Sequence, residues 1–247
     1  MRVRYIFVEG NVGAGKSTLI DRVQPVLREL LGRDESLEDV VAVPEPIERW
    51  TNVGGTGHNM LEAFYQDKKR YAAQFQSHAL VTRVQAVNEA IAAWCLRTQP
   101  EYAGGEHTLY VLCERSIFTD RHVFVEALRQ DGDISPLEHA AYTTWWEFWQ
   151  QRLYPGDVAA VVYLQATPDR CLWQMHRRGR TEEAGVPKTY LQRLNELHEV
   201  AMARPDTWRG ARRICMNVAE LGNLPFSEAA AMACAKTIYN FVTDTIS

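Results

Sequence analysis

The sequence lacks an apolar run long enough to cross a membrane, since such a span needs roughly 18 consecutive apolar residues. A strand-like segment begins almost at Met1, so we expect no targeting peptide before it. The five cysteines are scattered and form no Cys-x-x-Cys pair, which indicates neither a zinc site nor a disulfide framework. We therefore expect reduced thiols and a cytoplasmic location.

The chain also lacks an excess of basic residues, because its formal net charge is −4. A protein that binds nucleic-acid polymers usually carries a basic surface, so a polymer partner is disfavoured. There is no internal repeat, low-complexity tract or linker, and residues 1–247 are predicted to form a single domain. At 46% hydrophobic residues, the chain can bury a sizeable core.

Short apolar runs alternate with helical patterns along the whole chain. The runs predict strands at residues 3–9, 40–43, 108–113, 158–164 and 212–218. The helical patterns cover residues 16–31, 60–97, 117–129, 136–153, 169–178, 187–202 and 227–245. Strands that are continuously apolar and alternate with helices are typical of a parallel sheet covered on both faces. We therefore predict an α/β fold with three layers, α/β/α, and a five-stranded parallel sheet.

A phosphate-binding loop lies between the first predicted strand and helix. The pattern G-x-x-x-x-G-K-[ST] is complete, and its backbone amides can turn around phosphate oxygens at the start of the helix. The lysine can reach the β- and γ-phosphates, and the serine hydroxyl can bind Mg²⁺. ATPases, switch GTPases and nucleotide kinases all share this P-loop. The residues expected to bind ATP here are Gly10, Asn11, Val12, Gly13, Ala14, Gly15, Lys16, Ser17 and Thr18.

Two carboxylates follow the second and third predicted strands, at the edge where open α/β sheets bind ligands. Glu45 could accept a proton from a hydroxyl that attacks the γ-phosphate. Glu114 could hold Mg²⁺, and the adjacent Arg115 could steady a phosphate or the base. By position alone, these residues are also typical of a surface loop and of the first turn of a helix.

An arginine-rich turn lies between two later helical patterns. Arg177, Arg178 and Arg180 flank Gly179, an arrangement suited to clamping a transferring phosphoryl group with a lid that can close. We place this lid at about residues 174–186. A solvated charged turn is the alternative interpretation.

Several short segments occur along the chain in a characteristic order. They are Gly10-Asn11, Pro44-Glu45-Pro46-Ile47-Glu48-Arg49-Trp50, Phe75-Gln76-Ser77, Glu114-Arg115-Ser116-Ile117-Phe118, Arg178-Gly179-Arg180-Thr181-Glu182-Glu183, Tyr190-Leu191 and Leu197-His198-Glu199. With these segments, the chain resembles the deoxyribonucleoside kinase family, which includes deoxycytidine, deoxyguanosine, mitochondrial thymidine and insect multisubstrate kinases. The resemblance runs from Tyr5 to about His198.

The resemblance implies a nucleoside-kinase fold and transfer of the ATP γ-phosphate to the 5′-hydroxyl of a deoxynucleoside, with Mg²⁺. Glu45 then falls at the general base, Arg115 at the arginine that contacts it, and Glu114 at the Mg²⁺-associated carboxylate. Tyr65 and Glu183 match the pair that holds the sugar 3′-hydroxyl, and Gln76 matches the glutamine that reads the base. The remaining residues of the implied nucleoside site are Val12, Ile47, Trp50, Leu61, Phe75, Arg83, Asp120 and Phe124.

Arg83 and Asp120 bear on the choice of base. In the family that the chain resembles, an arginine and an aspartate at these positions are typical of kinases that act on deoxycytidine and purine deoxynucleosides. We therefore expect this protein to prefer those substrates over thymidine. Two features depart from the family. Gln174 stands where an additional lid arginine is common, and the loop at residues 52–59 is short, nearer to the insect enzyme.

Two other functions remain open from the residues. A thymidylate-type nucleotide kinase shares the fold, although Glu45 would repel its phosphorylated acceptor. A P-loop ATPase or switch protein would need a Walker B strand, in which an aspartate follows a run of hydrophobic residues. The third predicted strand is followed instead by Glu-Arg-Ser. The resemblance also implies a homodimer, and part of the aromatic stripe at Trp145, Trp146, Phe148 and Trp149 could reach a partner helix.

Overall fold

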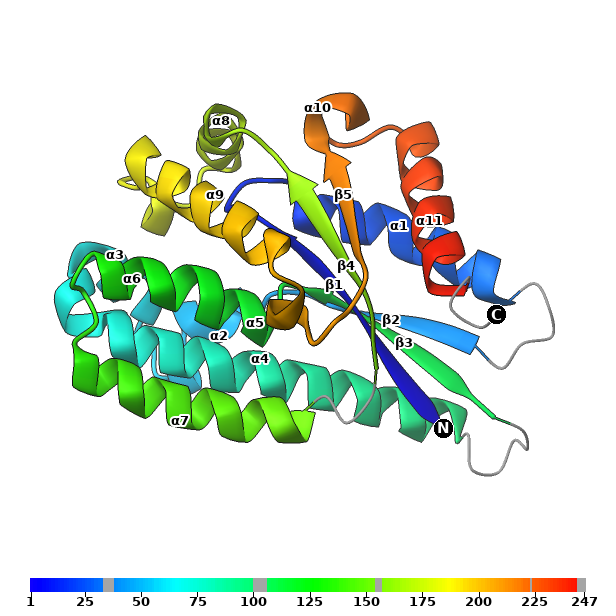
Figure 1. Ribbon diagram of the computed structural model, residues 1–247, viewed down its shortest axis with the longest axis horizontal. Helices are drawn as coiled ribbons and strands as arrows, with labels where there is room; N and C mark the ends of the chain where they lie inside the picture. Colours follow the sequence, from blue (N-terminus) through cyan, green and yellow to red (C-terminus); the bar gives the residue numbers. More distant parts are fainter. Residues whose placement is uncertain (33–37, 100–105, 154–156, 223, 244–247) are drawn as a thin grey trace.

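A parallel sheet of five strands forms the centre of the computed structural model (Figure 1), which describes residues 1–32, 38–99, 106–153, 157–222 and 224–243. The strands lie in the order β2-β3-β1-β4-β5, and every neighbouring pair is parallel. This confirms the predicted sheet. The strands are β1 (Arg2–Gly10), β2 (Glu38–Val43), β3 (Thr108–Glu114), β4 (Asp157–Gln165) and β5 (Arg213–Asn217).

Helices cover both faces of the sheet, as predicted. On one face, α1 (Lys16–Leu31) packs beside α11 (Glu228–Thr243), and on the other lie α4 (Lys68–Thr98), α7 (Pro136–Leu153) and α9 (Lys188–Ala203) (Figure 1). In the described part of the chain, no helix is both long and apolar enough to span a membrane. Short helices complete the fold: α2 (Ile47–Thr51), η2 (Val53–Gly55), α3 (Met60–Gln66), α6 (Glu126–Gln130), α8 (Pro168–Arg178), η4 (Thr181–Glu183), η5 (Pro205–Trp208) and α10 (Val218–Leu221).

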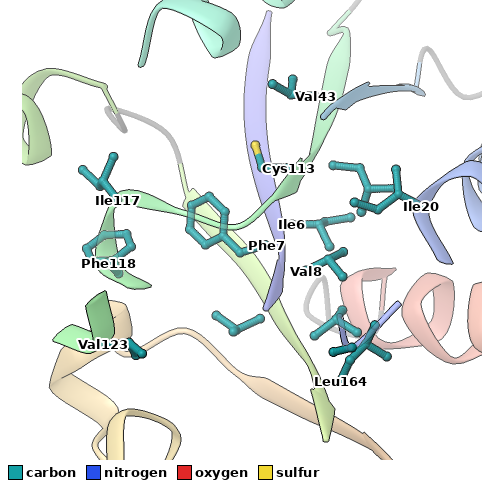
Figure 2. Packing of buried hydrophobic residues seen from close by; sticks show 14 of the residues in the cluster. Ile6, Phe7, Val8, Ile20, Val43, Cys113, Ile117, Phe118, Val123 and Leu164 are labelled. Atoms are coloured by element: carbon teal, nitrogen blue, oxygen red, sulfur yellow. The ribbon is translucent and has the colours of Figure 1, made fainter. Parts of the chain in front are cut away.

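Successive side chains of the central strand β1 enter the core on opposite faces. Ile6 and Val8 point toward Ile20 of α1, whereas Phe7 points toward Phe118 on the other face (Figure 2). The ring centroids of Phe7 and Phe118 are 5.9 Å apart. Because both faces are covered by helices, every position from Arg4 to Gly10 is buried, which explains why the middle of the strand, Tyr5 to Val8, is apolar without alternation.

The helix predicted at residues 117–129 is interrupted. It consists of α5 (Ile117–Thr119), a π-helical segment η3 (Asp120–Val125) and α6. Its apolar pattern could not show the interruption, because a π turn differs from an α turn by only one residue. Such turns occur frequently at functional sites, and this one carries two of the predicted nucleoside residues. The other predicted elements differ from the structure by a few residues at their ends, and residues 244 and 245 of the last predicted helix lie outside the described residues.

Candidate active site

Two connected cavities lie where the strands end. The larger, of about 900 Å³, is lined by every residue expected to bind the nucleoside, from Val12 to Glu183. The smaller, of about 420 Å³, is lined by the phosphate loop and the lid. The residues common to both cavities are Gly13, Lys16, Ser17, Glu114, Arg178 and Arg180. The structure therefore brings the predicted donor and acceptor residues together around one junction.

The phosphate loop needs glycine where it passes close to α8. Gly13 has φ +79°, and a Cβ atom there would lie 2.4 Å from the carbonyl oxygen of Cys171. Gly15 and Thr18 line the smaller cavity. Gly10, Asn11 and Ala14 are buried, and neither cavity is lined by them. The Asn11 side-chain amide donates to the carbonyl of Leu191 (2.8 Å), which connects the loop to α9.

Lys16 is buried at the junction of the two cavities. Its ammonium group donates to the carbonyl of Asn11 (3.0 Å). Burial and the neighbouring Arg115 lower the pKa of Lys16 to about 8, although Glu114 and Glu45 favour the charged form. A bound polyphosphate would favour the ammonium form further, because opposite charges attract strongly in a buried site.

Glu45 is held between two guanidinium groups. Its Oε1 atom lies 3.0 Å from Arg83 and 3.1 Å from Arg115, and only 17% of its side chain is exposed. Burial by itself opposes ionisation, but Arg115, Arg83 and Lys16 together lower the pKa of Glu45 to about 2. The group is therefore a carboxylate throughout the physiological pH range.

Arg115 has an unusual backbone conformation, with φ +65°. A non-glycine residue in the left-handed region is strained and persists only where its surroundings hold it there. Its backbone N–H donates to Val8 (3.0 Å), its side chain donates to the carbonyl of Gly10 (2.7 Å), and its guanidinium carbon lies 4.7 Å from the ring centroid of Phe124. Arg115 thereby directs its Nε atom toward Glu45.

Arg83 bonds to three other residues that line the larger cavity. Its Nε and Nη2 atoms donate to both carboxylate oxygens of Asp120 (2.9 and 3.2 Å), and its Nη1 atom donates to the carbonyl of Glu114 (3.0 Å). The same Nη2 atom also donates to Glu45 (3.0 Å). The sequence predicted that Arg83 and Asp120 lie together, but it did not predict that Arg83 also holds Glu45.

Aromatic side chains form one wall of the larger cavity. Trp50 meets Phe75 edge to face, with ring centroids 5.5 Å apart, and Phe64 stacks on Phe75 at 4.7 Å. The indole N–H of Trp50 donates to the Thr82 hydroxyl (2.9 Å), which fixes the orientation of the ring. Gln76 lies on the same helix as Phe75 and also lines the cavity. Sequence reasoning missed Phe64, although it lies in the same helical pattern as Leu61 and Tyr65.

A hydroxyl and a carboxylate meet beside the phosphate loop. The Ser17 hydroxyl donates to the Glu114 carboxylate (2.9 Å). Mg²⁺ in nucleotide enzymes takes one or two protein oxygens, with substrate phosphates and water as its other ligands, so this donor set fits the ion. Among the described residues, no cluster of three or more histidines, cysteines or carboxylates could hold a metal by itself.

The lid residues are already paired with one another. Arg178 and Arg180 form ion pairs with Glu183, the latter at 3.4 Å. Beside them, the Asn59 side chain donates to Glu182 (2.9 Å) and connects the lid to the start of α3. Glu183 and Tyr65 both line the larger cavity.

Comparison with known proteins places the chain in a family. The model of the family described as deoxynucleoside kinase matches residues 6–242. The chain belongs to the deoxynucleoside kinase family. The match continues beyond His198, where the resemblance in the sequence weakened. As a deoxynucleoside kinase, the protein is a phosphotransferase with the P-loop α/β fold that the sequence predicted.

Individual deoxynucleoside kinases are similar over most of their length. A deoxycytidine kinase of Bos taurus is 30% identical over 212 residues, which cover 80% of this chain and 75% of that protein. Deoxycytidine kinase 2 of Gallus gallus is 30% identical over 239 residues, or 91% of this chain and 80% of that protein. A mitochondrial deoxyguanosine kinase of Xenopus laevis is 27% identical over 220 residues, covering 84% and 76%.

The structure of this deoxynucleoside kinase also contains a buried pair that sequence reasoning missed. Glu9 is fully buried and accepts a hydrogen bond from the Ser116 hydroxyl (2.6 Å), directly beneath Arg115. One signal was present, because Glu9 is the only carboxylate in the apolar run at residues 3–9. A charged residue at the end of a buried strand needs a partner, and that expectation could have led to Ser116.

Proposed function

We propose that this deoxynucleoside kinase transfers the γ-phosphate of ATP to the 5′-hydroxyl of a deoxynucleoside, with Glu45 as the base. The observation that carries the proposal is the position of Glu45. It lies between the aromatic cavity and Lys16, and two buried arginines hold it as a carboxylate. A carboxylate in hydrogen-bonding reach of an acceptor hydroxyl can orient that hydroxyl and take its proton as the phosphoryl group arrives.

The donor triphosphate would bind in the smaller cavity. The loop amides and Lys16 would hold its β- and γ-phosphates, and Ser17 and Glu114 would hold Mg²⁺. Bound there, Mg²⁺ would neutralise charge on the phosphate oxygens. Arg178 and Arg180 would exchange part of their pairing with Glu183 for the phosphoryl group, and the lid at about residues 174–186 would exclude water.

The acceptor would occupy the larger cavity. Its base would lie along the wall of Trp50 and Phe75, because every nucleobase has a face that can stack on an aromatic ring. Gln76 would read the base edge, and Tyr65 with Glu183 would hold the sugar 3′-hydroxyl. Val12, Ile47, Leu61 and Phe124 would form the apolar remainder of the pocket.

We further propose a preference for deoxycytidine and purine deoxynucleosides over thymidine. Arg83 and Asp120 form a doubly hydrogen-bonded, buried pair, which offers a polar surface where a thymine methyl would need an apolar one. The named relatives are deoxycytidine and deoxyguanosine kinases, which favours the same preference.

Steady-state kinetics with labelled ATP and the four deoxynucleosides tests both parts of the proposal. Phosphorylation of none of them would contradict the activity, and a thymidine kcat/KM at or above the other three would contradict the preference. Arg83→Met with Asp120→Ala should raise the ratio of thymidine to deoxycytidine use. The ratio is the proper measure, because losing Arg83 also removes a partner of Glu45 and lowers turnover with every substrate.

We also propose that the chain forms one domain and pairs with a second copy through α4 and α7, which lie side by side (Figure 1). Trp145 and Leu137 of α7 are 57% and 79% exposed, and Leu96 of α4 is 80% exposed. An exposed apolar surface on two adjacent helices is typical of a protein interface. The proposed location is the cytoplasm, which agrees with five cysteines that are all free thiols.

A further inference from the structure

Glu9 is a buried acid at the end of β1, one residue before the phosphate loop. Its exposed fraction is 0%, and it lies on the same face of the strand as Phe7, toward α5 and η3. Burying an ionisable group opposes folding unless the group is paired, so its retention needs a reason. Nothing in the proposed transfer uses Glu9 directly, because neither cavity is lined by it.

Three consecutive residues of β1 hold the turn that carries Arg115. The carbonyl of Val8 accepts the Arg115 backbone N–H (3.0 Å), and the carbonyl of Gly10 accepts its guanidinium (2.7 Å). Between them, the Glu9 carboxyl accepts the Ser116 hydroxyl (2.6 Å). Ser116 in turn caps α5 by accepting from the Thr119 N–H.

The turn is strained at the residue that these contacts surround. Arg115 adopts φ +65°, a conformation that costs about 1–3 kcal/mol outside glycine and reverts unless neighbouring contacts hold it. The contacts at Val8 and Gly10 hold Arg115 at its backbone and at its guanidinium. The hydrogen bond to Glu9 holds Ser116, the residue after Arg115, and so restrains the C-terminal end of the turn.

We propose that Glu9 is a positioning residue that acts through Ser116 to keep Arg115 in the conformation that directs its guanidinium at Glu45. This inference rests on the proposed role of Glu45 and Arg115. Burial also raises the pKa of Glu9, despite the opposing effects of Ser116, Thr119, Arg115 and Arg83, which favours a neutral acid at this position. A neutral group can hold the turn without cancelling the positive charge of Arg115.

The test compares two substitutions of Glu9. Glu9→Gln keeps an acceptor oxygen for Ser116, and kcat should stay within about threefold of wild type. Glu9→Met has similar length without an acceptor, and kcat should fall roughly 10- to 100-fold, because small displacements of catalytic groups have effects of this size. The nucleoside KM should change much less. Equal losses of kcat in both variants would overturn the proposal.

A double-mutant cycle separates positioning from general destabilisation. If Glu9 acts through Arg115, Glu9→Met should lower kcat little further in an Arg115→Met background. If the kcat of the double variant instead falls by the product of the two single-variant losses, the proposal is contradicted. Tyr110→Phe is a matched control, since it removes a buried hydroxyl bonded to Arg4 at the opposite end of the sheet. It should lower thermal stability and leave kcat unchanged.

Ser116→Ala provides a smaller change if Glu9→Met does not fold. Its crystal structure should show Arg115 away from φ +65° and its Nε atom beyond hydrogen-bonding distance of Glu45. An unchanged Arg115 in that structure would overturn the proposal without any measurement of activity. Failure of the proposed function would be distinct, because the wild-type enzyme would then phosphorylate no deoxynucleoside.

Discussion

Replacing Glu45 by glutamine tests the centre of the proposed mechanism. The substitution keeps the size and one acceptor oxygen of the side chain but removes its charge and nearly all of its basicity. A missing general base lowers turnover by roughly 10²–10⁴. Since the amide oxygen can still accept a hydrogen bond from the 5′-hydroxyl, we expect kcat to fall by this factor with a much smaller change in nucleoside KM.

The structure also sets the expected effect of Glu45→Gln on folding. Arg83 keeps its bonds to Asp120 and to the Glu114 carbonyl, and Arg115 keeps its bond to the Gly10 carbonyl. The variant therefore loses charge-assisted hydrogen bonds, but each arginine keeps a hydrogen-bond acceptor, and the expected cost is about 1–3 kcal/mol. At about 2–4 °C per kcal/mol for a chain of this size, the protein should remain folded at 25 °C.

The assay is steady-state turnover of deoxycytidine at saturating ATP, at pH 6 and at pH 8. Burial opposes ionisation, but Arg115, Arg83 and Lys16 hold the Glu45 pKa at about 2, so the carboxylate is present at both pH values. The loss of kcat should therefore be the same at both. Glu228→Gln, which changes an exposed carboxylate on α11 that lines neither cavity, is the matched control and should turn over normally. Near-normal kcat for Glu45→Gln would refute the role of Glu45 as the base.

Three further predictions concern the phosphate loop and the dimer. In the free enzyme, burial and Arg115 lower the Lys16 pKa to about 8, so the ammonium is lost as pH rises through that value and kcat/KM for ATP should fall above pH 8. The corresponding fall in kcat should occur at higher pH, because bound ATP favours the ammonium form. If neither kcat nor kcat/KM falls as pH rises, Lys16 is not the titrating group. Gly13→Ala should abolish ATP binding measured by calorimetry, because the new Cβ meets a backbone oxygen at 2.4 Å, whereas Gly57→Ala, also at positive φ but with nothing within 4 Å, should bind normally. Trp145→Glu should shift the protein toward a monomer in sedimentation velocity, and Trp173→Glu, at a similarly exposed position on α8, should not. No shift with Trp145→Glu would contradict an interface at α7.

Much of the fold was predictable because its determinants are local in the sequence. The strand at residues 158–164 is a continuous apolar run, and the strand at residues 3–9 is apolar apart from Arg4 and Glu9. The structure reproduces the predicted ends of α1 and α7. The phosphate loop is equally local, since its function depends on glycine and lysine at set spacings within one turn. The parallel order then brings residues after different strands to one edge, which is why Glu45 and Glu114 were predicted to lie together.

The least predictable contacts join segments far apart in the chain. Arg83 was expected to contribute to the choice of nucleobase. The fold gives it a second partner in Glu45, because α4 passes both the π turn at Asp120 and the end of β2. The strained backbone of Arg115 also depends on distant groups, since three residues of β1 hold it. No local pattern shows such a conformation, because an isolated chain would relax to a right-handed one.

The sequence by itself determined the class of fold, the donor loop and the family, since each depends on residue types at short spacings. The tertiary structure decided how the charges in the acceptor cavity are shared. Four ionisable side chains, Glu45, Arg83, Arg115 and Asp120, come from three separate segments. Ion pairs link both arginines to Glu45, and Arg83 also to Asp120. Their protonation and direction depend on distances of about 3 Å in a buried site, where electrostatic interactions are strong, and only the folded chain sets those distances.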